Sequence, residues 1–264
     1  MATETTRHLA SDCVDAGVLH ADWPAPANVR TAITLRSLNG VSKPPYEAFN
    51  LGTRCGDDPA AVAANRAHLA EMLGLPERPC WLRQVHGNGV FDASTAPAVL
   101  ADEPQADAAI AETPGRVLAV LTADCLPLLL CAADGSAVGI AHAGWRGLAG
   151  GVIEAAVARL GVPAESVLAW LGPAIGSRSY EVGEDVGAAF VQTDASAASA
   201  FAPTRPGHWL CDLSALARQR LAAAGVRRVF GGGFDTRADA RFYSYRRDRE
   251  TGRFASLIWI DAAR

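Results

Sequence analysis

The stretch "DCLPLLLCAADGSAVGIAHAGW" (residues 124–145) contains two apolar runs separated by the pair Asp134-Gly135. Aspartate followed by glycine between two such runs is a strong signal for a β-hairpin with a two-residue turn. A turn at this place predicts two antiparallel strands in which Pro127 faces His142. This hairpin sets the centre of the expected fold and brings two reactive side chains together.

The two reactive side chains are Cys125, just before the first apolar run, and His142, just after the second. Side chains alternate between the faces of a strand, so Cys125 and Pro127 point the same way. Cys125 and His142 are then diagonal neighbours on one face, about 7 Å apart between backbones. A register slip of one residue would place them on opposite faces.

A neighbouring cysteine and histidine are compatible with three kinds of site. Thiolate and imidazole can hold zinc together with a third protein ligand. In a thiol enzyme, the histidine would instead accept the cysteine proton and the thiolate would attack a carbonyl group. In the third interpretation, both residues simply fill the core at the end of a sheet. The residues of the hairpin leave all three open.

The composition is that of a soluble globular protein: 264 residues, 50% hydrophobic, 20% charged, with a formal net charge of -4. A mildly acidic chain without a basic run has no electrostatic reason to bind nucleic acid or an anionic membrane. The longest apolar stretch is interrupted by Asp124 and Pro127, which argues against a membrane span. Neither nucleic acid nor a membrane is therefore an expected partner, and the composition leaves a monomer or a homodimer open. The expectation of a small-molecule substrate comes from the motifs considered below.

Cysteine usage indicates the compartment. The six cysteines form no C-x-x-C pair and no dense framework, which is typical of a reduced, cytoplasmic protein. The N-terminus has no basic segment followed by an apolar run and does not read as a signal peptide. Residues 1 to about 20 lack periodicity and are expected to form a loose leader, with 21–264 as a single catalytic domain.

Hydrophobic periodicity predicts a single α/β domain of the α+β type. Its mixed, largely antiparallel β core is flanked by helices in a layered sandwich. Helices are expected over 56–75, 146–160 and 212–225, each with capping or terminating signals. Besides the hairpin, strands are expected at 29–37, 80–93 (interrupted at 87–89), 116–123, 167–176 (ending in a loop), 227–233, 240–248 and 254–262.

Three further motifs are specific enough to indicate a family. "RQVHGNGV" (83–90), "TADCLPLLL" (122–130) and "AHAGWRGLAGGV" (141–152) together resemble a bacterial family of laccase-domain, or polyphenol oxidase, proteins. Its members are also described as zinc-dependent purine nucleoside phosphorylases with adenosine deaminase activity, and as the peptidoglycan editing factor. The resemblance extends from about residue 30 to the C-terminus.

The resemblance implies a metal held by His86, Cys125 and His142. Two histidines and a cysteine plus water form an open, catalytic type of zinc site. Zn²⁺ is the expected cofactor, and Cu²⁺ can occupy such a site in vitro. The implied activity is phosphorolysis of adenosine, inosine or methylthioadenosine, with some deamination of adenosine. The alternative is an amidase acting on a UDP-muramoyl-serine type peptidoglycan precursor.

Several other residues are candidates for the site, each with a structural alternative. Arg146 and the backbone N–H groups beside Gly144 and Gly147 can bind phosphate, or Arg146 can be a surface cation packed on Trp145. Asp124 can carry a proton or orient a ligand, or can simply form a turn.

Loop residues and aromatic residues supply the remaining candidates. Ser42 and Asn50 can contact the substrate or bond locally to the backbone. Trp81 and Trp145 can stack on a purine or pack in the core. If 240–248 is a strand, its tyrosines and arginines alternate, so only one of the two kinds faces a pocket.

Two departures from the family pattern concern specificity. The chain reads Ser37-Leu38-Asn39 where the family has Arg-x-Gly, with its arginine one place earlier at Arg36, and it has Asp235 where the family has cysteine. True laccase chemistry is disfavoured on other grounds. A trinuclear copper cluster needs many histidines, largely in H-x-H pairs, and the six histidines here form none.

Overall fold

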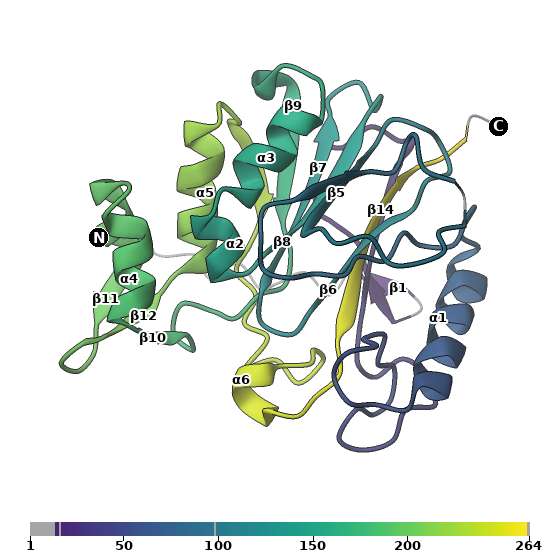
Figure 1. Ribbon diagram of the computed structural model, residues 1–264, viewed down its shortest axis with the longest axis horizontal. Helices are drawn as coiled ribbons and strands as arrows, with labels where there is room; N and C mark the ends of the chain where they lie inside the picture. The colour runs from purple at the N-terminus through teal and green to yellow at the C-terminus, as the bar shows by residue number, and fades with distance from the viewer. Residues whose placement is uncertain (1–13, 16, 98, 263–264) are drawn as a thin grey trace, which may run out of the picture.

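The computed structural model describes residues 14–15, 17–97 and 99–262, and its core is a pair of packed β-sheets (Figure 1). The first sheet has five strands in the order β1-β2-β3-β14-β6, and each neighbouring pair is antiparallel. Its strands are β1 (Val14–Asp15), β2 (Val18–Leu19), β3 (Val29–Thr34), β6 (Leu118–Thr122) and β14 (Phe254–Ile260).

The second sheet has six strands in the order β13-β9-β7-β8-β5-β4, with parallel pairs only at its two edges. A smaller antiparallel sheet has the order β10-β12-β11. The core is therefore mixed and largely antiparallel, as predicted. The strands are β4 (Val90–Asp92), β5 (Ala108–Ala111), β7 (Leu126–Ala132), β8 (Val138–Ala143), β9 (Val167–Leu171), β10 (Glu181–Gly183), β11 (Phe201–Pro203), β12 (His208–Cys211) and β13 (Arg228–Gly231).

Helices cover the outer faces of both large sheets, which completes the predicted layered sandwich (Figure 1). The inner faces meet in one apolar cluster, where Ile33 and Phe254 of the first sheet pack with Leu129 and Ile140 of the second. The helices are α1 (Pro59–Leu73), α2 (Trp145–Ala149), α3 (Val152–Arg159), α4 (Glu184–Val191), α5 (Leu213–Ala223) and α6 (Tyr245–Asp248), with 3-10 helices at Ala164–Ser166 and Ala195–Ala200.

Helices α1 and α5 lie within the predicted ranges 56–75 and 212–225 and are capped by residues of those ranges. The Asp58 side chain accepts a hydrogen bond from the Ala60 N–H at the start of α1, and Gly74 ends that helix in the left-handed region. The Asp212 side chain caps α5 through the Ala215 N–H. Leu69 anchors α1 on the five-stranded sheet, while α2, α3 and α5 cover the six-stranded sheet.

The β7–β8 hairpin has the predicted register, with Pro127 opposite His142. Its turn is different from the predicted one. A two-residue type I′ turn needs positive φ at both central residues, and only Gly135 has it. The strands instead close at Ala132 and Ala137, so the loop has two extra residues. The two extra loop residues are Ala133 and Ser136, one from each strand, so the pairing of the remaining strand residues is unchanged.

Two predicted elements are wrong, and a third is correct only in part: of the strand expected at 80–93, the structure has β4 and isolated bridges at Cys80 and Arg83. The helix expected at 146–160 is broken into α2 and α3 at Gly150-Gly151, where Gly151 adopts φ 88°. The strand expected at 240–248 is a loop followed by the one-turn helix α6, capped by the Ser244 hydroxyl oxygen, which accepts from the Arg247 N–H. The aromatic residues of this segment favour a strand because they pack well on a sheet surface. Here the Ser244 cap stabilises a helical turn instead.

The expected leader falls largely outside the described residues. Residues 1–13 and 16 are not described. Within the remainder, β1 and β2 pair with one another and β2 pairs with β3, so this part of the predicted leader adds to the five-stranded sheet.

Candidate metal centre and surrounding cavity

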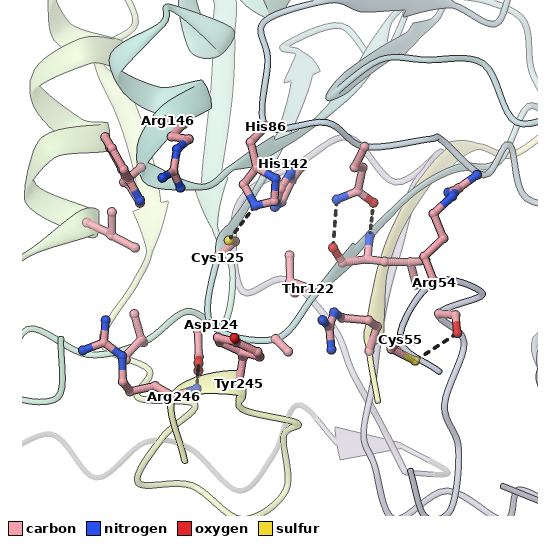
Figure 2. A pocket seen from close by; sticks show the side chains of 18 of the residues that line it. Arg54, Cys55, His86, Thr122, Asp124, Cys125, His142, Arg146, Tyr245 and Arg246 are labelled. Atoms are coloured by element: carbon pink, nitrogen blue, oxygen red, sulfur yellow. Dashed lines mark hydrogen bonds between the residues drawn. The ribbon is translucent and has the colours of Figure 1, made fainter. Parts of the chain in front are cut away.

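His86, Cys125 and His142 come together at one end of the six-stranded sheet (Figure 2). One ligand atom from each lies within 4.8 Å of those of the other two. Cys125 immediately precedes β7, His142 lies in β8, and His86 is in the loop before β4. The hairpin register thus joins Cys125 with His142, and a separate loop supplies His86. We call these three residues the trio.

The geometry of the trio suits a tetrahedral ion. The Cys125 Sγ and His86 Nε2 atoms are 3.8 Å apart, and two such ligands on one tetrahedral zinc would be about 3.6 Å apart, given bonds of about 2.3 and 2.05 Å. A Cβ atom at Gly144 would lie 2.9 Å from Cys125 Sγ and 3.0 Å from His86 Cδ2. Glycine at this position therefore leaves the space that the trio occupies.

Asp107, just before β5, holds two members of the trio in place. Its fully buried carboxylate accepts hydrogen bonds from His142 Nδ1 at 2.8 Å and from the backbone N–H groups of Val85, His86 and Gly87 at 2.7–3.1 Å. A carboxylate acceptor at Nδ1 fixes the imidazole proton there and turns Nε2 toward the trio. The same contacts secure the backbone at His86, which has φ 61°.

Asp107 is not among the candidate residues that the sequence motifs indicate. The signal was present, since this is the single acidic residue at the start of an otherwise apolar run, "ADAAIA" at 106–111. A buried charge requires partners. What the sequence did not show was that these partners come from residues twenty to twenty-two positions earlier and thirty-five positions later.

The electrostatics of the trio favour a thiolate. Burial opposes ionisation of Cys125, but the neighbouring imidazoles of His142 and His86 outweigh it and lower the pKa of the thiol to about 6. Burial also disfavours charge on His142, yet Cys125 and Asp107 raise the pKa of this imidazole to about 9. For Asp107, hydrogen bonds from His142 and the Gly87 N–H overcome burial and lower the pKa. Thiolate is the form that binds metals.

In the metal-free protein, we expect alkylation of Cys125 by iodoacetamide to accelerate as the pH rises through about 6 and to level off above it. An ordinary cysteine requires a pH near about 8.5. The depressed pKa also means that the thiolate stabilises the fold at higher pH and that this contribution is lost as pH falls through about 6. Labelling rates at Cys125, followed by peptide mass spectrometry, measure the profile.

The matched control for this profile is His142→Asn, which removes the strongest cationic neighbour of the thiol. Its labelling profile should shift to higher pH. Zinc should protect Cys125 in the parent protein. A parent midpoint near about 8.5, unchanged in the variant, would contradict the proposed electrostatics.

A cavity of ≈ 480 Å³ opens beside the trio (Figure 2). Its apolar lining comes mainly from Leu82, Leu121, Ile175 and Leu213, with the rings of Trp145, Tyr180 and Tyr245. Its polar lining includes four arginines: Arg54, Arg146, Arg246 and Arg253. Among the described residues that line it, Asp124 supplies the one carboxylate. The cavity therefore combines apolar surface with positive charge.

Arg146 and Asp124, both candidates from the sequence, line this cavity. The Arg146 guanidinium lies over the Trp145 ring, 4.2 Å from its centroid. Within the described part of the chain, Arg146 has no ion pair. The Asp124 carboxylate accepts from the Thr236 hydroxyl at 2.7 Å and from the Arg246 N–H at 2.6 Å. Both oxygens are engaged, which favours a role in holding α6 against the cavity.

Tyr245 and Arg246 both line the cavity, although the strand predicted at 240–248 would have placed them on opposite faces. The helical turn of α6 removes that restriction. Arg246 Nη1 donates to the Glu181 carbonyl at 2.7 Å, and its guanidinium lies over Tyr180. Trp81 lines a different cavity, against α1.

Ser42 and Asn50 are buried outside the cavity lining. The Ser42 hydroxyl donates to Asp57 at 2.6 Å. The Asn50 amide nitrogen donates to Gly52 and Asp57, and its oxygen accepts from the N–H groups of Gly52 and Arg253. In the described structure these two residues shape the loop that carries the cavity wall.

The departures from the family pattern also lie outside the lining. Arg36 contacts Glu47 and Asp248 and packs over Tyr243. Asp235 accepts from the Gly176 N–H and from the Ser179 hydroxyl. Among the described residues, no helix is both long and apolar enough to cross a membrane.

Fold and site together define an α/β sandwich protein with a candidate transition-metal site at the end of one sheet. The chain belongs to the family described as multi-copper polyphenol oxidoreductase laccase, whose model matches residues 30–261.

Relatives with curated names cover most of the chain. A purine nucleoside phosphorylase of Xylella fastidiosa is 54% identical over 251 residues, covering 92% of this chain and 96% of the relative. One of Pseudomonas aeruginosa is 52% identical over 244 residues, covering 92% and 98%. The crystal structure of a Neisseria meningitidis protein has a TM-score of 0.89 and 48% identity, covering 93% of this chain and all of that one.

Proposed function

We propose that this protein is a zinc-dependent purine nucleoside phosphorylase. The observation that carries the proposal is one cavity in which a His-Cys-His trio lies beside three arginines, Arg146, Arg246 and Arg253, that have no carboxylate partner among the described residues. The names of relatives more than 50% identical over nine-tenths of the chain support the same reaction. The transformation is attack of phosphate on C1′ of a nucleoside, with departure of the purine base.

Zinc fits the donor set of the trio. One thiolate and two imidazoles are ligands that zinc prefers, and three protein ligands leave one position open. When bound, zinc would supply a Lewis acid at this end of the cavity. Copper also binds nitrogen and sulfur ligands, so Cu²⁺ can replace zinc in vitro.

Arg146 is the proposed phosphate ligand. Its guanidinium is held against the Trp145 ring and has no ion pair among the described residues. It can donate hydrogen bonds to two phosphate oxygens at once. Arg246 adds a second positive charge, since one of its nitrogens is used by the Glu181 carbonyl and no carboxylate neutralises it in the described chain. Phosphate would therefore be bound in its anionic form beside the trio.

The purine base would pack on the apolar lining of the cavity. Ile175, Leu213 and Tyr180 supply surface that removes a planar ring from water. Asp124 contributes indirectly, because it fixes the N-terminal end of α6 through the Arg246 N–H. In this scheme the chain binds and orients both substrates, and the leaving base takes up the proton.

Laccase chemistry is disfavoured despite the family's description. Oxidation by a multicopper centre requires several metal ions close together. Within residues 14–15, 17–97 and 99–262, the trio is the one group of three or more potential ligands. The cysteines of the described residues are also free of disulfides, which supports the proposed cytoplasmic setting.

The deciding experiment is phosphate-dependent release of hypoxanthine from inosine by zinc-loaded protein. We expect stoichiometric ribose 1-phosphate and no release without phosphate. Deamination of adenosine, measured as ammonia in the same preparation, tests the second proposed activity. Zinc binding without any purine release would contradict the proposed phosphorolysis and favour the precursor amidase.

Replacing Arg146 by methionine should raise the KM for phosphate about tenfold or more, because charge-assisted hydrogen bonds contribute about 1.5–3 kcal/mol. The KM for inosine should change much less, which initial-rate kinetics with each substrate varied will reveal. Arg159→Met is the control, since Arg159 pairs with Asp92 away from the cavity. Equal increases in both KM values would contradict the assignment of phosphate to Arg146.

A further inference from the structure

The positive charge of the cavity is divided between two sides. Arg146 and Arg54 lie on opposite sides of the trio in the view of Figure 2. Arg146 and Arg246 come from α2 and α6, whereas Arg54 is in the loop between β3 and α1. Arg253 belongs with Arg54, because its side chain packs against Gly52, where an added Cβ would lie 2.7 Å from Arg253 Cγ.

On the Arg54–Arg253 side, an ion pair with a carboxylate engages Arg54, whereas Arg253 has none among the described residues. Arg253 Nη1 donates only to the carbonyls of Thr251 and Gly252, and the guanidinium has no carboxylate partner among the described residues. Arg54 pairs with Glu103 at 2.7 Å, but Glu103 is shared with Arg66 at 3.0 Å. One carboxylate thus serves two arginines, and Arg253 adds a further charge.

One inorganic phosphate at Arg146 leaves this second side without an anion. The local backbone also keeps Arg253 in position: its N–H donates to the buried Asn50 side chain, and its carbonyl accepts from the Leu51 N–H. A held, unneutralised guanidinium on a cavity wall is typical of a site for a phosphate or carboxylate group.

We propose that Arg253, assisted by Arg54, forms a second anion subsite that binds the 5′-phosphate of a purine nucleoside 5′-monophosphate. The assignment of the ligand rests on the proposed function. In a β-nucleoside the 5′ substituent, carried by C4′, lies on the same face of the ribose ring as the base, and phosphate displaces the base by approaching C1′ from the opposite face. A ribose with C1′ directed to phosphate at Arg146 therefore extends its 5′ substituent away from that phosphate, toward the Arg54–Arg253 side.

The corresponding reaction balances without any additional reagent. A phosphate oxygen forms a bond to C1′ as the C1′–N9 bond breaks, and the bond electrons leave with the base. The base takes up the proton that the attacking hydrogen phosphate loses, and the products are the free purine and ribose 1,5-bisphosphate. The 5′-phosphate is a binding group and takes no part in bond making.

The first test is binding to the zinc-loaded protein without inorganic phosphate, measured by isothermal titration calorimetry. The enzyme should bind AMP at least about tenfold more tightly than adenosine or adenosine 3′-monophosphate, as expected for charge-assisted hydrogen bonds. The preference should decrease with rising salt. Arg253→Met should weaken AMP binding about tenfold and adenosine binding far less. Arg227→Met, exposed outside the cavity, should leave both unchanged.

Turnover provides the second test. Phosphate-dependent release of hypoxanthine should have a higher kcat/KM for IMP than for inosine, and Arg253→Met should remove this advantage. Equal affinity for AMP and adenosine, equal affinity for the 3′-phosphate, or equal losses in Arg253→Met would overturn the subsite. AMP binding through Arg253 without base release from any substrate would support the subsite and overturn the phosphorylase. Release of hypoxanthine from inosine without a preference for IMP would support the phosphorylase and overturn the subsite.

Discussion

Replacing His142 by alanine is expected to abolish both zinc binding and phosphate-dependent base release. The side chain is buried, is oriented by Asp107 and presents Nε2 to the other two ligands. Removing it leaves two protein ligands, too few for a stable zinc site of this type. Cys125→Ser and His86→Ala should have the same effect. Metal analysis of purified protein should show about one zinc per chain in the parent and almost none in the variants.

A histidine outside the trio provides the control. His68 is exposed on α1 and has an edge contact with Phe49, so His68→Ala should keep full zinc content and activity. Treatment of the parent with a chelator should remove activity, and added zinc should restore it. If the metal-free parent remained active and alkylation of Cys125 then inactivated it, the thiol would be the nucleophile and the zinc mechanism would be wrong.

The sequence could predict the part of the site that depends on local rules. Residues 125 and 142 belong to one hairpin, and the alternation of side chains along its strands determines which residues share a face. The register is correct even though the turn is longer, because apolar strands buried on both sides restrict slippage. His86 required the family resemblance, since no local pattern joins residue 86 to the hairpin.

The rest of the site depends on contacts distant in sequence. Arg246 reaches the cavity because the Asp124 carboxylate accepts its N–H across more than a hundred residues. The aromatic run that precedes Arg246 predicts a strand when only the local sequence is considered. Likewise, the polar loop sequence leaves open whether Ser42 and Asn50 contact the substrate or bond locally, and the fold supplies Asp57, Gly52 and Arg253 as their partners. Such pairings are set by packing of the whole fold, which a window of sequence does not contain.

Asp107→Asn should reduce zinc affinity about tenfold to a hundredfold although Asp107 does not belong to the trio. An amide has one acceptor oxygen and one donor nitrogen. The carboxylate here receives four N–H groups, two on each oxygen. In either orientation, the amide nitrogen of asparagine would face two donors, so either His142 and the His86 N–H or the N–H groups of Val85 and Gly87 would lose their acceptor.

The same substitution should lower the free energy of unfolding by about 1–3 kcal/mol, the cost of leaving buried donors unsatisfied. Zinc competition with a chromogenic chelator measures the affinity, and denaturant unfolding of the metal-free protein measures the stability. Asp92→Asn is the matched control, because Asp92 is half-buried at the end of β4 and contacts Arg159 and the Ser94 N–H, away from the trio. Unchanged zinc affinity in Asp107→Asn would show that His142 is held by packing alone. A loss of affinity without a comparable effect in Asp92→Asn would show that the carboxylate determines which nitrogen of His142 is offered to the metal.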